Sequence, residues 1–220
     1  MYLVIKRLVD IVLSGLLILL LSPILILIIL ILKFTGEREV FYSQERVGYK
    51  ANSFMIFKFA TMMKNSPNIG SGDVTLRNDP RVTIIGKYLR ESKLNEVPQL
   101  FNILIGDISI IGPRPLMREG FNRYSLKFQN SVYNVKPGLT GIGSIVFRDE
   151  EKIITDSNLT PHECYKKIIL PYKGALELWY QSKCNFFLDL QLMFLTAWVI
   201  VYPKSKIYEK WFKDLPKREF

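Results

Sequence analysis

The chain has 220 residues, of which 49% are hydrophobic and 23% are charged, so it can bury one core of ordinary size. Its formal net charge of +10 favours anionic partners, which include nucleic acid, anionic lipid and phosphorylated substrates. The two cysteines, Cys164 and Cys184, are too few for a disulfide framework and lack the spacing of a zinc site. These features exclude a disulfide-stapled secreted domain and favour a reducing, cytoplasmic setting.

An uncharged stretch near the amino end covers residues 11–32. As a helix it would be about 33 Å long, enough to cross a bilayer core of about 30 Å. It is too long for a signal peptide, and no small-residue cleavage site follows it. We therefore interpret it as a membrane segment.

Two topologies are open for this segment. Ser22-Pro23 at its middle predicts a bend, which suits either a bent spanning helix or a re-entrant one. Cations flank both ends: Lys6, Arg7, Lys33 and Arg38. Because cations near membrane segments prefer the cytoplasmic side, the charge pattern is compatible with both ends facing the cytoplasm.

The next elements are a β-hairpin and three helices. Two β-rich runs around residues 48–52 predict a hairpin within residues 40–61, and the Pro- and Gly-containing residues 65–79 predict a loop. Helices are predicted over residues 84–91, 96–105 and 116–130. We expect Asn95 to cap the second of these helices and Gly106 to end it.

The carboxyl-terminal part is predicted to be helical. Thr160-Pro161-His162-Glu163 combines a capping box with proline at the first helical position, and the helix should continue towards Cys184 with a bend at Pro171. An apolar helix should follow Asn185 and stop before Pro203. The basic tail after it has apolar residues at helical spacing, and it either lies on a membrane or docks on the core.

Residues 79–115 hold the densest set of candidate functional side chains. Asn95-Glu96 sits at a predicted helix start, where free N–H groups attract phosphate. Arg81, Arg90 and Arg114 offer guanidinium groups that suit phosphate oxygens. Glu96 and Asp107 are hard oxygen donors of the kind that Mg²⁺ takes beside substrate phosphates. Each residue alone has a plain structural explanation, but together, beside a membrane anchor, they indicate a phosphate site.

In these motifs the chain resembles the bacterial sugar transferases, monotopic enzymes that transfer phosphosugars to polyprenyl phosphate. The resemblance covers nearly the whole chain. It rests on Lys6-Arg7 with Asp10, the Ser22-Pro23 break, FYSQERVG, IFKFATM, DPRVT, LNEVPQL, GDISIIGPRP, KPGLTG and Leu188-Asp189-Leu190.

The resemblance implies a helix-dominated α/β fold with two parts. Residues 1–33 would form a re-entrant membrane helix hairpin, and residues 34–220 a small cytoplasmic catalytic domain with a β-hairpin and interfacial helices. It further implies that the activity depends on Mg²⁺ and that Glu96 and Asp107 hold this ion. The family motifs add Arg46 and Lys58 to the phosphate-binding arginines, and they favour a substrate-facing role for residues 137–141.

Two positions depart from the family pattern. Ala60 stands where the family usually has arginine, and Lys58 is the candidate to compensate for it. Asn95 stands where the family usually has a nucleophilic aspartate, and a neutral amide is a poor nucleophile. Four explanations stay open: Glu96 is the nucleophile, transfer is direct, Asn95 is deamidated, or the chain is inactive.

The expected function is transfer of a sugar-1-phosphate from a UDP-sugar to undecaprenyl phosphate, which releases UMP and initiates O-antigen, capsule or exopolysaccharide synthesis. The catalytic residues would be Glu96 and Asn95, at the cytoplasmic face of the bacterial inner membrane and among its lipids. The alternative is an inactive membrane-tethered scaffold or nucleotide-sugar-binding protein. Nucleic acid is not an expected partner, because no such motif accompanies the basic charge. The sequence leaves the oligomeric state open, a homodimer included.

Overall fold

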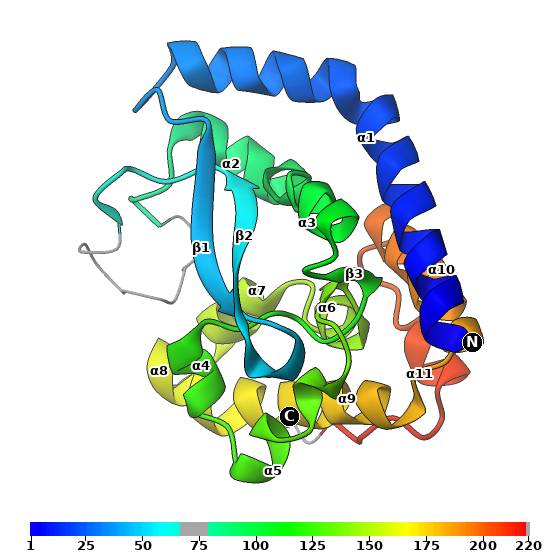
Figure 1. Cartoon of the computed structure of the whole chain (residues 1–220). Coiled ribbons are helices and arrows are strands. Elements are labelled where there is room, and N and C mark those ends of the chain that lie inside the picture. The colour runs from blue at the N-terminus through cyan, green and yellow to red at the C-terminus, as the bar shows by residue number, and fades with distance from the viewer. Residues whose placement is uncertain (67–78, 219–220) are drawn as a thin grey trace.

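A computed structural model describes residues 1–66 and 79–218 of the chain. The loop predicted for residues 65–79 lies almost entirely outside the described residues. Helices dominate the described part, and a long amino-terminal helix lies across the top and one side of the other elements (Figure 1). Two small two-stranded sheets complete the fold. The predicted helix-dominated α/β class, with a long apolar first helix and a small sheet, is confirmed.

The first helix, α1 (Tyr2–Phe34), continues through Pro23 and changes direction along its length (Figure 1). It is one bent helix and not two helices joined by a turn. In the part of the chain that the structure describes, α1 alone is long and apolar enough to cross a bilayer. Its buried residues lie in both halves, Asp10 and Ser14 in the first and Leu25, Ile28 and Leu32 in the second. Both halves therefore pack on the rest of the protein, while most of the apolar surface of α1 is exposed.

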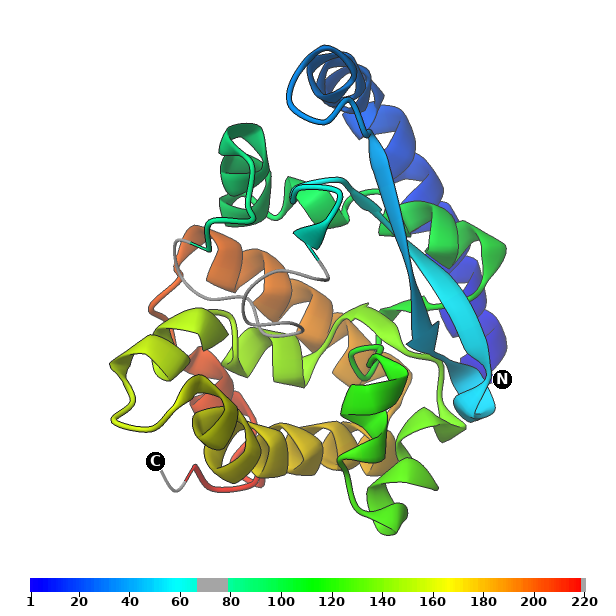
Figure 2. The same ribbon diagram turned by 90° about the vertical axis from the view of Figure 1, so that its left-hand side faces the viewer.

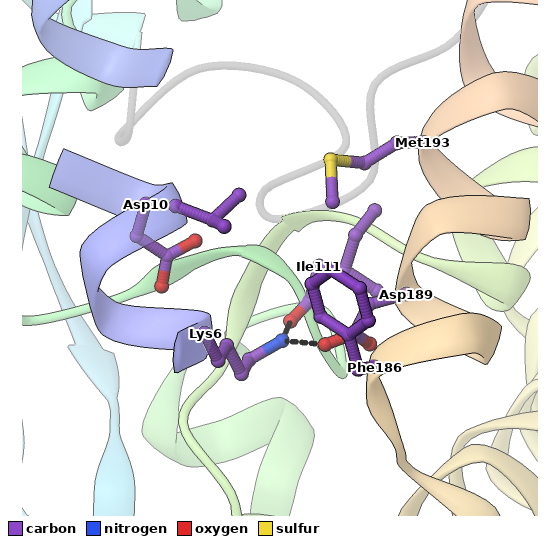
Figure 3. A pocket seen from close by; sticks show the side chains of 7 residues that line it. Lys6, Asp10, Ile111, Phe186, Asp189 and Met193 are labelled. Carbon is purple, nitrogen blue, oxygen red and sulfur yellow. Dashed lines mark hydrogen bonds and ion pairs between the residues drawn. The ribbon is translucent and has the colours of Figure 1, made fainter. Parts of the chain in front are cut away.

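An ion pair fastens the start of α1 to the helix α10 (Phe186–Val201). Lys6 Nζ lies 2.6 Å from Asp189 Oδ2 and also donates to the carbonyl oxygen of Ile111 at 2.8 Å (Figure 3). Asp189 accepts two further hydrogen bonds, from the hydroxyls of Tyr2 and Tyr180, both at 2.7 Å. Asp189 is buried, so its charge is compensated by three donors and not by water.

Two more polar residues attach α1 to the domain. The Asp10 carboxylate accepts hydrogen bonds from the Ser109 hydroxyl at 3.0 Å and from the backbone N–H of Ile110 at 2.9 Å. Arg7 donates to the carbonyl oxygens of Ile103 and Leu104, which lie in the last turn of a helix and lack helical partners there. Lys6 and Arg7, which flank the apolar segment in the sequence, therefore have specific partners far along the chain.

The predicted hairpin is formed by β1 (Phe41–Val47) and β2 (Ser53–Phe59), joined through the short helix η1 (Tyr49–Ala51). The strands are antiparallel, and Tyr42 pairs with Lys58. In both views the hairpin begins below the carboxyl end of α1 and runs down the molecule (Figures 1 and 2).

The helix predicted over residues 84–91 is α2 (Ile84–Glu91), which Thr83 caps by accepting from the N–H of Gly86. The helix predicted over residues 96–105 is wrong at its start. A 3₁₀ turn, η3 (Leu94–Glu96), comes first, and α3 (Gln99–Ile105) begins after Pro98. Leu100 and Phe101 still donate to the carbonyl oxygens of Val97 and Pro98, three residues back, so the α-helical bonding begins only beyond Pro98. Asn95 consequently does not cap a helix.

A parallel pair of short strands accounts for glycines in the motifs GDISIIGPRP and KPGLTG. In it β3 (Ser109–Ile111) pairs with β4 (Gly138–Thr140). A Cβ on Gly138 would lie 2.1 Å from the backbone nitrogen of Gly112, so only glycine permits this approach. Residues 137–141 thus serve strand pairing, and the substrate-facing role that the resemblance favours for them stays a prediction.

The helix predicted over residues 116–130 is two helices, α4 (Arg118–Asn122) and α5 (Leu126–Gln129). Ser125 caps the second one by accepting from the N–H of Phe128, which makes a new start there. The remaining elements are η4 (Val132–Asn134), α6 (Ile142–Val146), α7 (Glu150–Asp156), α8 (Pro161–Cys164), the π-helical turn η5 (Tyr165–Ile169), α9 (Leu170–Lys183) and α11 (Ile207–Trp211).

The predicted capping box at Thr160 is confirmed, and the π-helical turn lies just before Pro171, where a bend was predicted. The main core gathers residues of α6, α9 and α10 with buried Tyr208 and Phe212 of the tail. The tail therefore docks on the core, as one of the two alternatives predicted.

Asp189→Ala should destabilise the protein by roughly 3 kcal/mol, because it leaves the half-buried Lys6 charge without its carboxylate. The matched control is Asp214→Ala, which removes an exposed pair with Lys183 and should cost less than about 1 kcal/mol. Thermal unfolding in nanodiscs measures both. Equal midpoints for the two variants would show that the Lys6–Asp189 pair is not what holds α1 in place.

Candidate active site

The hairpin carries two of the predicted phosphate-binding residues on one face. Arg46 lies on β1 and Lys58 on β2, at positions that share a face by the register of the pairing. Arg46 is held by acceptors on either side: its guanidinium donates to Gln44 Oε1 and to the carbonyl oxygen of Pro115 at 3.4 Å. The hairpin thus presents two cations to the segment that follows β3.

A buried amide fixes β2 against α3. Asn102 accepts a hydrogen bond from the backbone N–H of Phe57 at 2.9 Å and donates to the carbonyl oxygen of Met55 at 2.7 Å. These bonds reach the residue just before Lys58 and hold its strand in place. The sequence motif LNEVPQLFN contains this asparagine, but the spacing alone did not reveal its role.

Glu96 and Arg114 bring two distant motifs together. Arg114 Nη2 donates to Glu96 Oε1 at 2.8 Å, and Lys58 Nζ lies 4.0 Å from the same oxygen. Glu96 comes from the 3₁₀ turn before α3, and Arg114 from the Gly-Pro-Arg-Pro corner after β3. The structure therefore brings together Glu96, Arg114, Lys58 and Arg46 from the predicted set.

The backbone of Arg114 is held as firmly as its side chain. The hydroxyl of Tyr133 donates to the carbonyl oxygen of Arg114 at 2.8 Å and accepts from the N–H of Leu116 at 2.9 Å. On the other side, the N–H of Arg114 donates to Glu177 Oε1 at 3.3 Å. Neither Tyr133 nor Glu177 was predicted from the sequence, because each lies in a separate element with no motif around it.

The charges in this cluster are unbalanced, with three cations around one carboxylate. Burial alone would raise the pKa of Glu96, but the charges of Arg114 and Lys58 outweigh it and lower that pKa to about 2. Burial lowers the pKa of Lys58 to about 7, assisted by the charges of Arg114, Arg46 and Arg90 and opposed by Glu96. Glu96 is thus an anion at neutral pH, and Lys58 titrates near it.

A small cavity lies between these residues. It is lined by Arg46, Ile56, Lys58, Gln99, Arg114 and Pro115. Two of its lining residues carry a buried donor with no hydrogen-bond partner among the described residues, namely Arg46 Nε and Gln99 Nε2. Unsatisfied buried donors cost free energy, so a site of this kind favours an acceptor such as a phosphate oxygen or a water.

Asn95 is buried beside Glu96, and within the described chain its Oδ1 has no hydrogen-bond donor. The predicted capping role is wrong, as the 3₁₀ turn shows. The side chain therefore contributes a neutral, unpaired oxygen next to a carboxylate.

Arg81 and Asp107 lie outside the cluster. Buried Arg81 pairs with Asp79, its Nη2 at 2.6 Å from Asp79 Oδ2. Asp107 follows α3 at its far end, where its carboxylate accepts from Asn102 at 3.0 Å. Arg90 is half-buried on α2, and its charge contributes to the lowered pKa of Lys58. Of the three arginines predicted to bind phosphate, only Arg114 contacts Glu96.

The oxygen donors fit Mg²⁺ only in part. Glu96 is the carboxylate that faces the cation cluster, and the position of Asp107 separates it from Glu96. Within residues 1–66 and 79–218, no group of three or more His, Cys, Asp or Glu side chains is placed to hold a metal. One carboxylate with substrate phosphates and water is nevertheless a common Mg²⁺ environment. Glu96 fits such a site, and the metal-binding role of Asp107 stays a prediction.

Comparison with known proteins points in one direction. Residues 1–203 match the family model described as bacterial sugar transferase. The chain is 36% identical over 199 residues to the UDP-glucose:undecaprenyl-phosphate glucose-1-phosphate transferase of Klebsiella pneumoniae, covering 88% of this chain and 39% of that protein. It is 30% identical over 207 residues to the exopolysaccharide production protein ExoY of Rhizobium meliloti (strain 1021), covering 87% of this chain and 83% of that protein.

A third relative is the undecaprenyl-phosphate galactose phosphotransferase of Salmonella typhimurium (strain LT2), at 29% identity over 210 residues. The chain covers 40% of that protein, and 89% of this chain is matched. The chain thus spans about two fifths of the Klebsiella and Salmonella relatives and most of ExoY.

The lowered pKa of Lys58 predicts that anion binding weakens as pH rises through about 7, because the free protein then holds a neutral amine. Sulfate is a suitable probe, since its own charge does not change in this range. Calorimetry should give about 10-fold weaker sulfate binding at about pH 8 than at about pH 6. Lys58→Met should shrink this difference, whereas Lys87→Met, at an exposed position on α2, should keep it. A Lys58→Met protein with the full pH dependence would exclude Lys58 as its source.

Proposed function

We propose, since the chain belongs to the bacterial sugar transferase family, that it transfers a sugar-1-phosphate from a UDP-sugar to undecaprenyl phosphate and releases UMP. The observation that carries the proposal is the cluster of Arg46, Lys58 and Arg114 around the Glu96 carboxylate. A diphosphate needs cations and hydrogen-bond donors around it, and this cluster supplies both. The relatives named for undecaprenyl-phosphate sugar transfer support the acceptor.

In the reaction, the bond between the sugar-bearing phosphorus and the oxygen that bridges to UMP breaks, and UMP leaves with that oxygen. A phosphate oxygen of the lipid forms the new bond, so the products are UMP and a lipid-linked sugar diphosphate. Arg114 and Lys58 would neutralise the charge on the oxygens of the transferred phosphorus, which is the main need of phosphoryl transfer. Bound Mg²⁺ would supply further charge neutralisation at Glu96.

Asn95 does not act as the nucleophile in this proposal, because its neutral amide does not attack phosphorus as a carboxylate does. Either the Glu96 carboxylate attacks the phosphorus and displaces UMP, forming an acyl phosphate that the lipid phosphate then cleaves to restore the carboxylate, or the lipid phosphate attacks directly and displaces UMP. Intact-mass measurement after incubation with donor alone distinguishes the two. A phosphosugar adduct on Glu96 indicates the first route, and its absence with full turnover indicates the second.

The membrane arrangement follows from α1. We propose that α1 enters and leaves on the cytoplasmic face of the inner membrane, because residues in both of its halves pack on the same domain. A straight spanning helix would carry one half away from that domain. The bend leaves its apolar outer surface for lipid and keeps the cation cluster on the side where nucleotide sugars are found.

The activity test is incubation of the purified protein with a panel of UDP-sugars, Mg²⁺ and undecaprenyl phosphate, with UMP and lipid-linked sugar measured together. Appearance of both products in equal amounts supports the proposal. A protein that binds the donors but forms neither product with any of them would favour the inactive scaffold.

Glu96→Gln should lower turnover by at least about 100-fold, because it removes the carboxylate that faces the cations and keeps the size of the side chain. Asp107→Asn should lower it by less than about 10-fold, since Asp107 lies at the other end of α3. Glu91→Gln, exposed on α2, is the surface control. If Asp107→Asn were as damaging as Glu96→Gln, the reacting groups would have to extend along α3.

A further inference from the structure

Behind the cation cluster lies a buried carboxylate that the proposed reaction does not use. Glu177 belongs to α9 and is 4% exposed. Its Oε1 accepts from the backbone N–H of Arg114, while its Oε2 has no hydrogen-bond partner in the described parts of the chain. An unpaired carboxylate oxygen in a protein interior is expensive, so its retention calls for a role.

The surroundings are shaped to this carboxylate. A Cβ on Gly143 in α6 would lie 2.3 Å from Glu177 Oε1, so the glycine leaves room for the carboxyl group beside α6. The carboxyl group of Glu177 therefore lies between α6 and the Gly-Pro-Arg-Pro corner. It is one partner of Arg114, whose guanidinium in turn contacts Glu96.

The charged and titratable groups around Glu177 come from every neighbouring element. Lys173 lies one helical turn away on α9 itself, but its Nζ is already paired with Glu150 of α7 at 2.5 Å. Arg114 faces Glu177 from the corner after β3, Tyr133 from η4, and Tyr124 from the segment between α4 and α5. Arg114 is the neighbouring cation that is also directed towards the cluster.

We propose that Glu177 is a positioning residue that holds the Arg114 backbone in both of its protonation states and takes up a proton when a phosphate dianion binds at Arg114. The carbonyl-type oxygen accepts the Arg114 N–H whether or not the group is ionised. The proton comes from solvent and is received by the unpaired Oε2. Uptake removes a negative charge that would otherwise repel the incoming anion through a medium of low dielectric.

The Glu177 carboxyl group titrates close to neutral pH. Burial raises its pKa to about 7, against the opposing effects of the Arg114 N–H and the charges of Lys173 and Arg114. Free protein near neutral pH is therefore a mixture of both forms, and the charge of an arriving ligand can shift that mixture. The inference rests on the proposed function in one respect, namely that the ligand of the cluster is a phosphate dianion.

The test compares sulfate binding by wild-type protein, Glu177→Gln and the exposed control Glu119→Gln. Calorimetry at about pH 7.5 in buffers of different ionisation enthalpy counts the protons taken up. The wild type and the control should take up about half a proton more than Glu177→Gln, which has nothing to titrate at this position. Glu177→Gln should also bind sulfate more tightly than wild type at about pH 8 and equally well at about pH 6. Equal proton uptake by all three proteins would overturn the proposal.

A further variant tests whether Glu177 positions Arg114. Glu177→Ala removes both the charge and the acceptor for the Arg114 N–H, so it should bind sulfate about five-fold more weakly than Glu177→Gln at every pH. Equal affinities for these two variants would show that Glu177 does not position Arg114. Sulfate binding needs no turnover, so it tests this inference separately from the proposed function. A protein that binds sulfate as expected here but forms no lipid-linked product would contradict the proposed function and not this inference.

Discussion

The ion pair between Glu96 and Arg114 is the contact on which the arrangement of the site depends. It joins the turn before α3 to the corner after β3, and Lys58 of the hairpin lies within 4.0 Å of the same carboxylate. Three separate stretches of chain therefore meet at one negative charge. Because three cations face that single carboxylate, the cluster has an excess of positive charge and suits an anionic ligand. Tyr133 and Glu177 hold the backbone of Arg114, and Glu96 holds its guanidinium.

Much of the fold could be predicted from local signals. The hairpin, α2 and the capping box at Thr160 follow from β-rich runs, helical spacing and caps that act within a few residues. The predictions failed where the local hydrogen bonding departs from one continuous helix. A 3₁₀ turn precedes α3, and Ser125 caps a new helix within a predicted continuous one. The pairing of β3 with β4 was missed because parallel strands meet through non-local contacts that no short pattern encodes.

The sequence predicted several residues of the site but not their arrangement in space. The motifs singled out Glu96, Arg114, Lys58 and Arg46, and the structure brings these side chains together. Arg81 and Asp107 carry the same chemistry in the same block of sequence, yet each is engaged by a close neighbour instead. Gln99 and Glu177 could not be recognised, because a buried amide donor or carboxylate oxygen without a partner becomes visible only when the surrounding elements are in place.

The attachment of α1 has a consequence for how the protein is made. Lys6 is separated from Asp189 by 183 residues, and Asp10 from Ser109 by 99. During synthesis the first helix emerges long before these partners exist, so its lysine and aspartate must wait in water or among lipid headgroups. Only translation of α10 completes the last of the contacts. The first helix can therefore take up its final position only after α10 has been made, and a chain interrupted before Asp189 would leave Lys6 without this partner.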